Sequence, residues 1–332
     1  MRLRIKITLI FALLYTPLSY SSEFENCFKN YAVSLPPETT IKDITDRCNS
    51  DLANPLTPSR LTKEKASQNN DFVITPHKQN YILPFTHNDK PNQKPWANQQ
   101  SYPGIDKPVQ HSEAKLQISL KVPLNYDDLF LPNDGLYFGF TLKSFWQVYN
   151  DDVSAPFRDT NYRPEMFYQA PLPYKKWGGT FITRLGFEHE SNGRSQYLSR
   201  SWNRVYVGLG FQKDNWLVYA QPWYRLPEDE KENDGDPDTP PPPEGDDNPN
   251  IDDFLGHYEL HAVYSYENYE LSTMARQNFS SGKGAIETNF SFPLWGRLKG
   301  MVQFYNGYGE SLIDYDHRVQ RIGVGILLTD LL

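Results

Sequence analysis

Apolar and polar residues alternate in short segments along most of this chain, from residue 81 to residue 330. Leu116, Ile118 and Leu120, for example, are separated by Gln117 and Ser119. A period of two places successive side chains on opposite faces of a β-strand, and no segment with a helical period stands out. We therefore predict about twelve strands, of which the first is the weakest: residues 81–85, 116–122, 136–142, 163–170, 178–190, 203–211, 215–225, 255–265, 269–277, 284–291, 297–306 and 319–330.

The connections between these strands alternate between two lengths. Residues 171–177, 212–215, 266–268 and 293–296 form short links, whereas residues 149–162, 191–202, 227–254 and 307–318 form longer ones. Short turns at one rim and long loops at the other, with an even number of strands, are typical of outer-membrane barrels. A soluble β-sandwich has no reason to sort its connections in this way. The pattern predicts an all-β domain, a twelve-stranded antiparallel transmembrane β-barrel, over residues 71–332.

The averaged composition agrees with a barrel. The mean hydropathy of the 332 residues is -0.66, and no run of about 20 apolar residues follows the first twenty positions, which excludes a bundle of transmembrane helices. In a barrel only every second residue faces lipid, so the average stays low. The net charge of -8 gives no reason to expect a nucleic acid as partner.

The N-terminus has the features of an export signal. Three basic residues precede the apolar run at residues 7–14, and Ser19 and Ser21 are small residues where a signal peptidase would cleave. The run is too short to span a membrane. We predict a signal peptide over residues 1–21 and export to the outer membrane of a Gram-negative bacterium.

Residues 22–70 are rich in Asn, Ser, Pro, Thr and Lys and show no sustained period. They predict a mostly irregular, poorly ordered periplasmic extension. The two cysteines of the chain, Cys27 and Cys48, lie in it. Because exported proteins meet an oxidising compartment, a disulfide is expected in preference to two free thiols or a metal site.

Three polar residues interrupt the apolar faces of two neighbouring predicted strands. His189 and Ser191 share a face at the end of one strand, and Asn203 begins the next. A serine hydroxyl becomes a nucleophile when an imidazole takes its proton and a third group orients that imidazole. An amide can orient it without a full charge, which suits a site next to lipid. The Gly193 backbone N–H can turn toward an oxyanion, although a His-x-Ser pair alone is more often ordinary surface.

Five motifs are more specific than this spacing. They are HESNGRS at residues 189–195, SRSWNR at 199–204, PFRDTNY at 156–162, PWY at 222–224 and GYGESLIDY at 307–315. Together they resemble the outer membrane phospholipase A family, over residues 72–332 and without the extension. The resemblance implies a barrel with a catalytic triad on its outer surface, in which His189 accepts the proton, Ser191 is the nucleophile and Asn203 orients the imidazole.

The resemblance also implies calcium, an ion that prefers oxygen ligands. The ligands carry over to the backbone carbonyl of Arg194, the side chain of Ser199 and, from the partner subunit, Ser154. A further calcium site of the monomeric form matches Asp247. Calcium-polarised water would complete an oxyanion hole with the amide of Gly193.

The resemblance implies, in addition, a reversible homodimer as the active form. One position departs from the family pattern. The type member of the family has a glutamine on the lipid face of the second strand that hydrogen-bonds across the dimer, and Leu142 stands at the matching position here. The change bears on the strength and control of the dimer and leaves the catalytic residues untouched.

These features predict a calcium-dependent outer-membrane phospholipase that hydrolyses the sn-1 and sn-2 acyl esters of phospholipids, and lysophospholipids too. A porin or adhesin barrel without enzymatic activity is the main alternative: it explains the strands and loops equally well but not the three polar residues. Weaker alternatives are an outer-membrane esterase acting on small esters or lipid A acyl chains, and a soluble β-sandwich hydrolase.

Overall fold

A computed structural model describes residues 27–29, 31–33, 39–53, 74–96, 109–125, 127–153, 155–172, 174, 177–232, 242, 244–296, 298–329 and 331. Its contacts divide the chain into two units, Met1–Thr57 and Pro58–Leu332. The signal peptide predicted at residues 1–21 lies outside the described residues. None of the described helices is long and apolar enough to cross a membrane.

The first unit contains helix α2 (Ile41–Ala53). Thr40 and Asp43 form a reciprocal capping box at its start, since the Asp43 N–H donates to Thr40 Oγ1 and the Thr40 N–H donates to Asp43 Oδ2. Cys48 is buried in the helix and forms the expected disulfide with Cys27. Residues 41–53 thus form a helix within an extension predicted to be mostly irregular, and the sequence analysis did not recognise its capping pattern.

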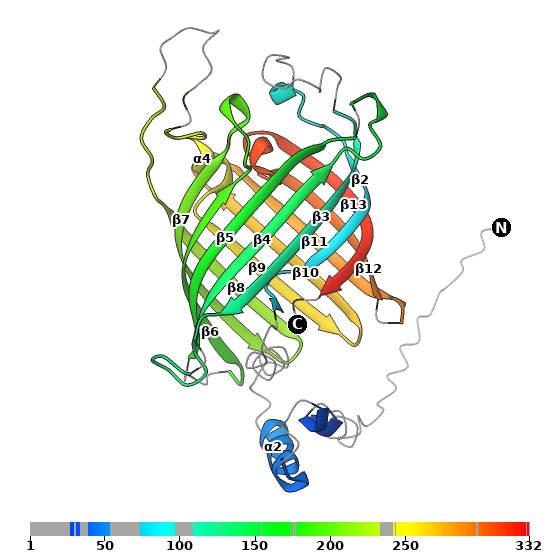
Figure 1. The fold of residues 1–332 in the computed structure, drawn as a ribbon, viewed down its shortest axis with the longest axis vertical. Helices are drawn as coiled ribbons and strands as arrows, with labels where there is room; N and C mark the ends of the chain where they lie inside the picture. The colour runs from blue at the N-terminus through cyan, green and yellow to red at the C-terminus, as the bar shows by residue number, and fades with distance from the viewer. Residues whose placement is uncertain are drawn as a thin grey trace, which may run out of the picture. The chain divides into compact units, whose positions relative to one another are not determined.

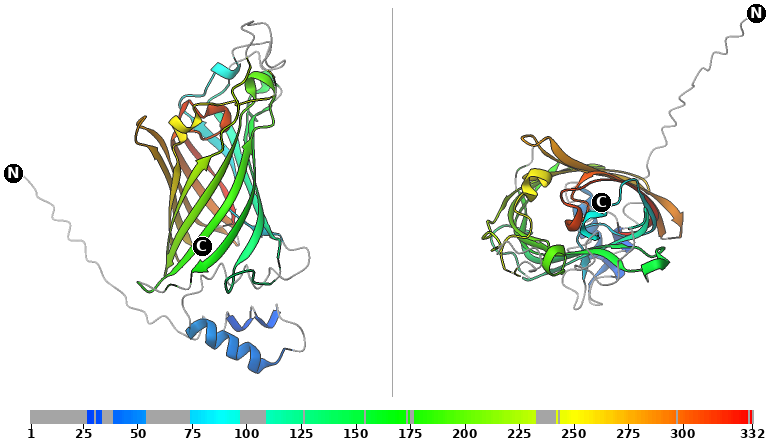
Figure 2. Two further views of the ribbon diagram at one scale, coloured as in Figure 1. Left: turned by 90° about the vertical axis from the view of Figure 1, so that its left-hand side faces the viewer. Right: turned by 90° about the horizontal axis from the view of Figure 1, so that it is seen from above.

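Among the described residues, the second unit is built around twelve long antiparallel strands (Figure 1). They are β2 (Asn80–Asn88), β3 (Ser112–Pro123), β4 (Gly135–Trp146), β5 (Phe157–Leu172), β6 (Thr180–Ser191), β7 (Ser201–Lys213), β8 (Trp216–Arg225), β9 (Tyr258–Tyr266), β10 (Tyr269–Asn278), β11 (Lys283–Trp295), β12 (Leu298–Tyr308) and β13 (Arg318–Thr329). Each strand pairs with its neighbours in the chain, and β13 pairs with β2, so the sheet closes on itself (Figure 2). The predicted barrel is confirmed. A two-residue strand, β1 (Thr75–Pro76), also pairs with β3.

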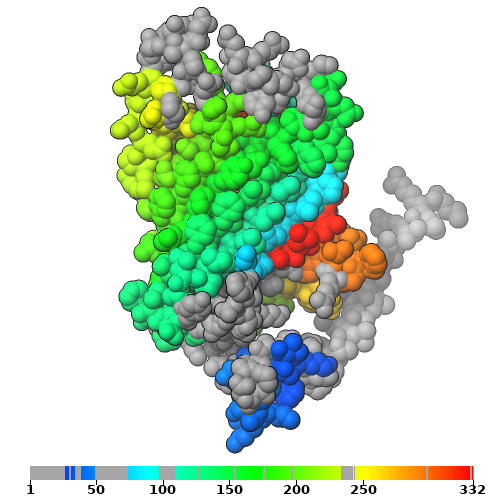
Figure 3. Space-filling model, in the orientation of Figure 1, coloured from blue at the N-terminus to red at the C-terminus, as the bar shows by residue number. Residues whose placement is uncertain are grey.

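The two faces of each strand differ in chemistry, and β7 shows this clearly. Val205, Val207 and Leu209 are exposed on the outside, with 52% of the Val207 surface accessible, whereas Arg204 and Tyr206 are buried inside. A water-soluble core would reverse this arrangement. The apolar face is the lipid-facing wall of the barrel, part of which Figure 3 shows over β3 to β7.

Several strands reach further toward the long-loop rim than predicted. Strand β5 begins at Phe157, so the loop predicted at residues 149–162 ends earlier, and the loop predicted at 191–202 spans residues 192–200. Above the apolar band both faces of a strand are polar, so the alternation that reveals a strand is lost. Two connections also depart from the predicted sorting, because the link at residues 124–134 is long for the short-turn rim and the link at 279–282 is short for the long-loop rim.

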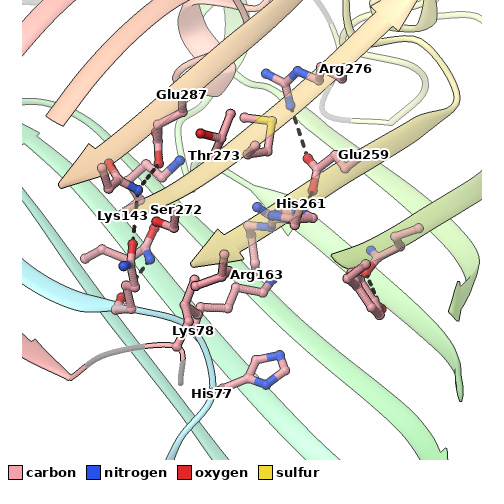
Figure 4. Close-up of a pocket in the computed structure, with 18 of the residues that line it drawn as sticks. His77, Lys78, Lys143, Arg163, Glu259, His261, Ser272, Thr273, Arg276 and Glu287 are labelled. Atoms are coloured by element: carbon pink, nitrogen blue, oxygen red, sulfur yellow. Dashed lines mark hydrogen bonds and ion pairs between the residues drawn. The ribbon is translucent and has the colours of Figure 1, made fainter. Parts of the chain in front are cut away.

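The lumen of the barrel holds many paired polar groups beside a cluster of buried apolar residues that includes Phe167 and Trp202. It holds a cavity of about 260 Å³ lined by charged and polar side chains from several strands (Figure 4). Arg276 on β10 and Glu259 on the neighbouring strand β9 form one pair at its wall, at 3.4 Å. His77 enters the lumen between β1 and β2, where its Nε2 lies 2.7 Å from Glu165. Because charged groups are spread around this cavity, we expect a lipid site on the apolar outer wall instead.

Candidate active site

The hairpin of β6 and β7 brings His189 and Asn203 together. They are register partners on the two strands, and both are half-buried on the outer face. The His189 Nδ1 and Asn203 Oδ1 atoms lie 2.9 Å apart. Because an amide oxygen can only accept, this contact requires the proton on Nδ1. The arrangement leaves Nε2 of the imidazole with a free lone pair, as a general base needs.

Ser191 lies two residues beyond His189 on the same face of β6. It is half-buried and pairs in register with Tyr162 on β5 and with Ser201 on β7. Both residues are described, and the Ser191 hydroxyl makes no hydrogen bond to His189. Catalytic hydrogen bonds are frequently long in the absence of substrate. The three predicted triad residues therefore lie at one end of one hairpin, with one of their two contacts formed.

Charged residues hold this hairpin from the lumen side. Glu188 and Glu190 flank His189 in sequence and point inward, where Arg204 contacts both. Arg163 on β5 contacts Glu188 at 2.9 Å. The indole N–H of Trp202 donates to Glu190 at 3.1 Å. These inward contacts tie β5, β6 and β7 together and fix the spacing of the outward triad.

Asn192 organises the loop at residues 192–200. Its side chain is buried, its Nδ2 donates to the Leu198 carbonyl at 2.8 Å, and its Oδ1 accepts from the backbone N–H groups of Arg194 and Arg200. A buried amide with both ends satisfied rigidifies its surroundings. The sequence analysis contained Asn192 only as one residue of the motif at 189–195, and its place beside Gly193 was the available signal for a larger role.

Gly193 has a φ of 61°, in the left-handed region. An added Cβ would lie 3.3 Å from the ring of Tyr162. The guanidinium of Arg194 donates to the carbonyls of Phe157 and Arg158, which anchors the loop to β5. Glycine at position 193 therefore lets the backbone turn close to the ring of Tyr162, which is the register partner of Ser191.

Buried polar contacts support this loop from below. Asp159 on β5 accepts from Asn192 Nδ2 at 3.3 Å and from the Ile313 backbone N–H at 3.2 Å. Arg158 contacts Asp314 at 2.7 Å. Residues 309–317 thus fold back into the barrel mouth and brace the rim at which the triad lies.

The predicted calcium ligands are only partly brought together. The Ser199 hydroxyl donates to Asp247 Oδ2 at 2.7 Å, and Asp247 Oδ1 lies 2.5 Å from Lys231 Nζ. Ser154 lies outside the described residues. Carboxylate and hydroxyl oxygens are hard donors that suit calcium, and the ammonium of Lys231 shows that this carboxylate attracts a cation. Across the described ranges, no group of three or more His, Cys, Asp or Glu side chains could hold a metal ion.

Glu228 is a neighbour of the triad that sequence reasoning missed. Its Oε1 accepts from Asn203 Nδ2 at 3.0 Å. It comes from the start of the connection between β8 and β9, which the sequence analysis predicted only as a long loop over residues 227–254. The signal was available in the pattern, because Glu228 continues the outward parity of Tyr224 at the end of β8.

Leu142 lies on the outer face of β4, as expected. It pairs in register with Ile118 on one side and Tyr162 on the other, and Tyr162 pairs with Ser191. Ile118 and Tyr162 are exposed. The position of the departure from the family pattern is therefore two strands from the candidate nucleophile, on the same wall.

Known proteins resemble this chain over most of its length. A sequence model of the family described as phospholipase A1 matches residues 58–328. Phospholipase A1 of Escherichia coli strain K12 is 34% identical over 295 residues, which cover 89% of this chain and 92% of that protein. Phospholipase A1 of Proteus vulgaris is 37% identical over 263 residues, which cover 79% of this chain and 83% of that protein.

Solved structures share the barrel. The outer membrane phospholipase A of Escherichia coli aligns with a TM-score of 0.68 and 36% identity, over 79% of this chain and 100% of that one. A Salmonella typhi outer membrane phospholipase, described as a dimer with bound calcium, aligns with a TM-score of 0.70 and 33% identity. That alignment covers 82% of this chain and 98% of that one.

Proposed function

Because this chain belongs to the phospholipase A1 family and is a phospholipase of the Gram-negative outer membrane, we propose that Ser191 is its nucleophile, His189 its general base and Asn203 the residue that orients the base. The observation that carries the proposal is the 2.9 Å contact between His189 Nδ1 and Asn203 Oδ1 on the outer face. It supports a serine-type ester hydrolysis at the surface of the barrel.

Each residue has a defined step in this reaction. His189 Nε2 takes the proton of the Ser191 hydroxyl as Oγ attacks the ester carbonyl carbon. The tetrahedral intermediate collapses when the protonated imidazole gives its proton to the departing alcohol oxygen, which releases the lysophospholipid. Water then attacks the acyl-serine ester, its proton goes to Nε2, and Ser191 Oγ leaves with that proton as the fatty acid is freed.

The outer wall beneath the triad supports a phospholipid as substrate. Phe138, Met166, Phe187, Val205 and Tyr224 are register neighbours across five adjacent strands, and all are exposed. Acyl chains can lie along this apolar row while the ester bonds reach the level of Ser191. We expect cleavage at both the sn-1 and sn-2 positions, and of lysophospholipids, because an open wall does not enclose one chain.

Calcium fits the oxygen donors at the rim. We infer that Arg194 through its carbonyl, Ser199 and the partner subunit's Ser154 hold it in the active form, and that Asp247 holds it in the monomer. The pairing of Ser199 with Asp247, at 2.7 Å, supports a hard-oxygen site there. When bound, the ion would polarise water toward the oxyanion beside the Gly193 amide.

Dimerisation follows from the same face of the barrel. A ligand from a partner subunit requires two copies to meet beside Ser191, and the row of Ile118, Leu142 and Tyr162 offers an apolar surface for that contact. We therefore infer a reversible homodimer as the active form. We also infer that residues 1–21 are removed as a signal peptide and that residues 22–70 form a periplasmic extension.

The deciding experiment compares wild type with Ser191→Ala in detergent, on phosphatidylethanolamine labelled at either acyl chain. We expect a loss of about 10⁴-fold or more in kcat with calcium present, and an equally strong loss when a chelator is added to wild type. Ser280→Ala, in an exposed turn, is the matched control. Hydrolysis retained by Ser191→Ala would overturn the triad, and liposome swelling without lipid cleavage would favour a porin.

A further inference from the structure

We propose that Glu228 is a positioning residue for the reaction, which acts on His189 through Asn203. It fixes which end of the Asn203 amide faces the imidazole and so determines which imidazole nitrogen carries the proton. The proposal rests on the triad proposed above and extends it by a fourth member.

The Asn203 amide lies between two partners. Its Oδ1 is 2.9 Å from His189 Nδ1, and its Nδ2 donates to Glu228 Oε1 at 3.0 Å. Both ends of the amide are therefore used. All three side chains are half-buried, so the contacts form at the margin of the apolar wall, where water competes less than at an open surface.

The chemistry of the amide makes this arrangement directional. An amide has a donating end and an accepting end, and either can face a neutral imidazole, which also has one of each. A carboxylate can only accept, so Glu228 pairs with the Nδ2 end and turns Oδ1 toward His189. The imidazole must then carry its proton on Nδ1, which leaves Nε2 free to take the proton of Ser191.

Without Glu228, the opposite orientation becomes available. If the amide rotates by half a turn, Nδ2 faces the imidazole and donates to Nδ1. The imidazole proton then resides on Nε2, which cannot accept the proton of Ser191. A wrong histidine tautomer lowers kcat by about 10⁴-fold in a serine hydrolase whose orienting group is altered.

Backbone geometry explains why Glu228 reaches Asn203. Arg204 and Arg225 are the last register partners of β7 and β8, and the Leu226 N–H still donates to the Asn203 carbonyl at 2.9 Å. The ladder thus continues one step past the end of β8. Because side chains alternate along an extended chain, Glu228 returns to the outward face that carries Asn203.

The placement of the charge also has a physical reason. A carboxylate directly on His189 would put a full charge beside lipid, which is costly. With a neutral amide next to the imidazole, the negative charge lies one step further toward the loop, where water reaches it. Glu190, although adjacent to His189 in sequence, points inward to Arg204 and Trp202 and does not serve this role.

The test uses three substitutions of Glu228 in the full-length protein. Glu228→Gln keeps a carbonyl oxygen that can accept from Nδ2, so we expect kcat within about threefold of wild type. Glu228→Ala removes the acceptor, and we expect kcat to fall roughly 10- to 100-fold with KM unchanged. Glu228→Lys offers only donors, favours the rotated amide and should cost about 10³-fold or more. Glu232→Ala, exposed in the same loop, is the matched control.

A second measurement reports the tautomer without reference to activity. Imidazole ¹⁵N shifts of histidine-labelled protein in micelles distinguish Nδ1–H from Nε2–H, and His189→Gln identifies the signal. We expect Nδ1–H in wild type and Glu228→Gln, and an increased share of Nε2–H in Glu228→Lys. The pH dependence of kcat/KM should change in Glu228→Lys as well.

The outcomes separate this proposal from the triad itself. If Ser191→Ala is inactive while Glu228→Ala and Glu228→Lys keep wild-type kcat and tautomer, the triad stands and the role of Glu228 is overturned. If Ser191→Ala keeps its activity, the proposed triad is wrong, and the role of Glu228 is overturned with it. A merely structural role for Glu228 would lower thermal stability and leave the histidine tautomer of the folded protein unchanged, which also overturns the proposal.

Discussion

The two faces of the β6–β7 hairpin contrast in how they use polar residues. On the lumen side, Glu188 and Arg204 are charged, buried and in direct contact. On the lipid side, His189, Ser191 and Asn203 are the polar interruptions of an apolar wall, and Asn203 carries no charge. The inner residues have an evident structural role because they link strands. The outer residues belong to no such charged network, and the proposed triad gives a reason for their presence beside lipid.

The free-energy cost of removing polar and charged groups from water explains why the two faces differ. A buried charge is tolerated when it is paired and hydrogen-bonded, as in the lumen, where Arg163 and Arg204 both meet Glu188. Beside lipid, charged groups are rare and polar groups are retained for function. Each face therefore predicts its own response to mutation: loss of stability inside and loss of catalysis outside.

The largest effect is expected from the outer face. His189→Ala removes the proposed base, so kcat should fall by about 10⁴-fold. The free energy of unfolding should change by only about 0.5 kcal/mol or less, because no packed core is disturbed. Hydrolysis of labelled phospholipid and urea unfolding of the vesicle-inserted barrel measure the two quantities. His257→Ala, at an exposed loop histidine, serves as control, and a stability loss as large as the catalytic loss would remove the contrast between the faces.

The inner face should respond in the opposite way. Glu188→Gln leaves Arg163 and Arg204 without their shared carboxylate, and the free energy of unfolding should fall by about 3–5 kcal/mol. Activity per folded molecule should fall far less than in His189→Ala. Urea unfolding with tryptophan fluorescence checks this, with Glu267→Gln in an exposed turn as control. Unchanged stability would show that the lumen pairs are not structural.

Acid should destabilise the barrel through a buried carboxylate at its mouth, as expected for the inner face. Burial alone would favour the neutral form of Glu310, but Arg321 and Lys115, at 2.8 and 2.9 Å, hold its pKa at about 2. A folded-state pKa below the unfolded value gives stability that is complete above the unfolded pKa and is lost as the pH falls through the folded one. We expect a loss of roughly 3 kcal/mol between about pH 5 and pH 2. The loss should be smaller in Glu310→Gln, and equal slopes for both proteins would contradict this.

The smallest effect concerns the outer wall beyond the triad. Leu142→Gln restores a group that can hydrogen-bond between two barrels, and we expect the dimer to strengthen by about 1 kcal/mol, or roughly fivefold in Kd. Energy transfer between labelled copies in detergent with calcium measures this. Ile322→Gln, at an apolar position on the outer face of β13, is the control. A gain of the same size in both variants would mean that the effect is not specific to this face.

The strands were predictable because a period of two is a local property. Val205, Val207 and Leu209 alternate with Arg204, Tyr206 and Gly208 in sequence as they do in space. The family motifs placed His189 and Asn203 in one site for the same reason, since a hairpin keeps residues that are near in sequence near in space. The start of β5 at Phe157 was missed, because polar residues on both faces hide the alternation there.

By itself the sequence determined the strand pattern, the lipid-facing wall and the hairpin that carries the proposed triad of this phospholipase, all of which depend on short-range order. Only the tertiary structure decided which distant groups meet. Asp314 under Arg158, Lys231 beside Asp247 and Glu228 behind Asn203 each join different elements of the barrel rim. Alternation can give the face on which a side chain such as Glu228 lies but not the partner that it meets, and these partners are set by the closed sheet that brings the loops together.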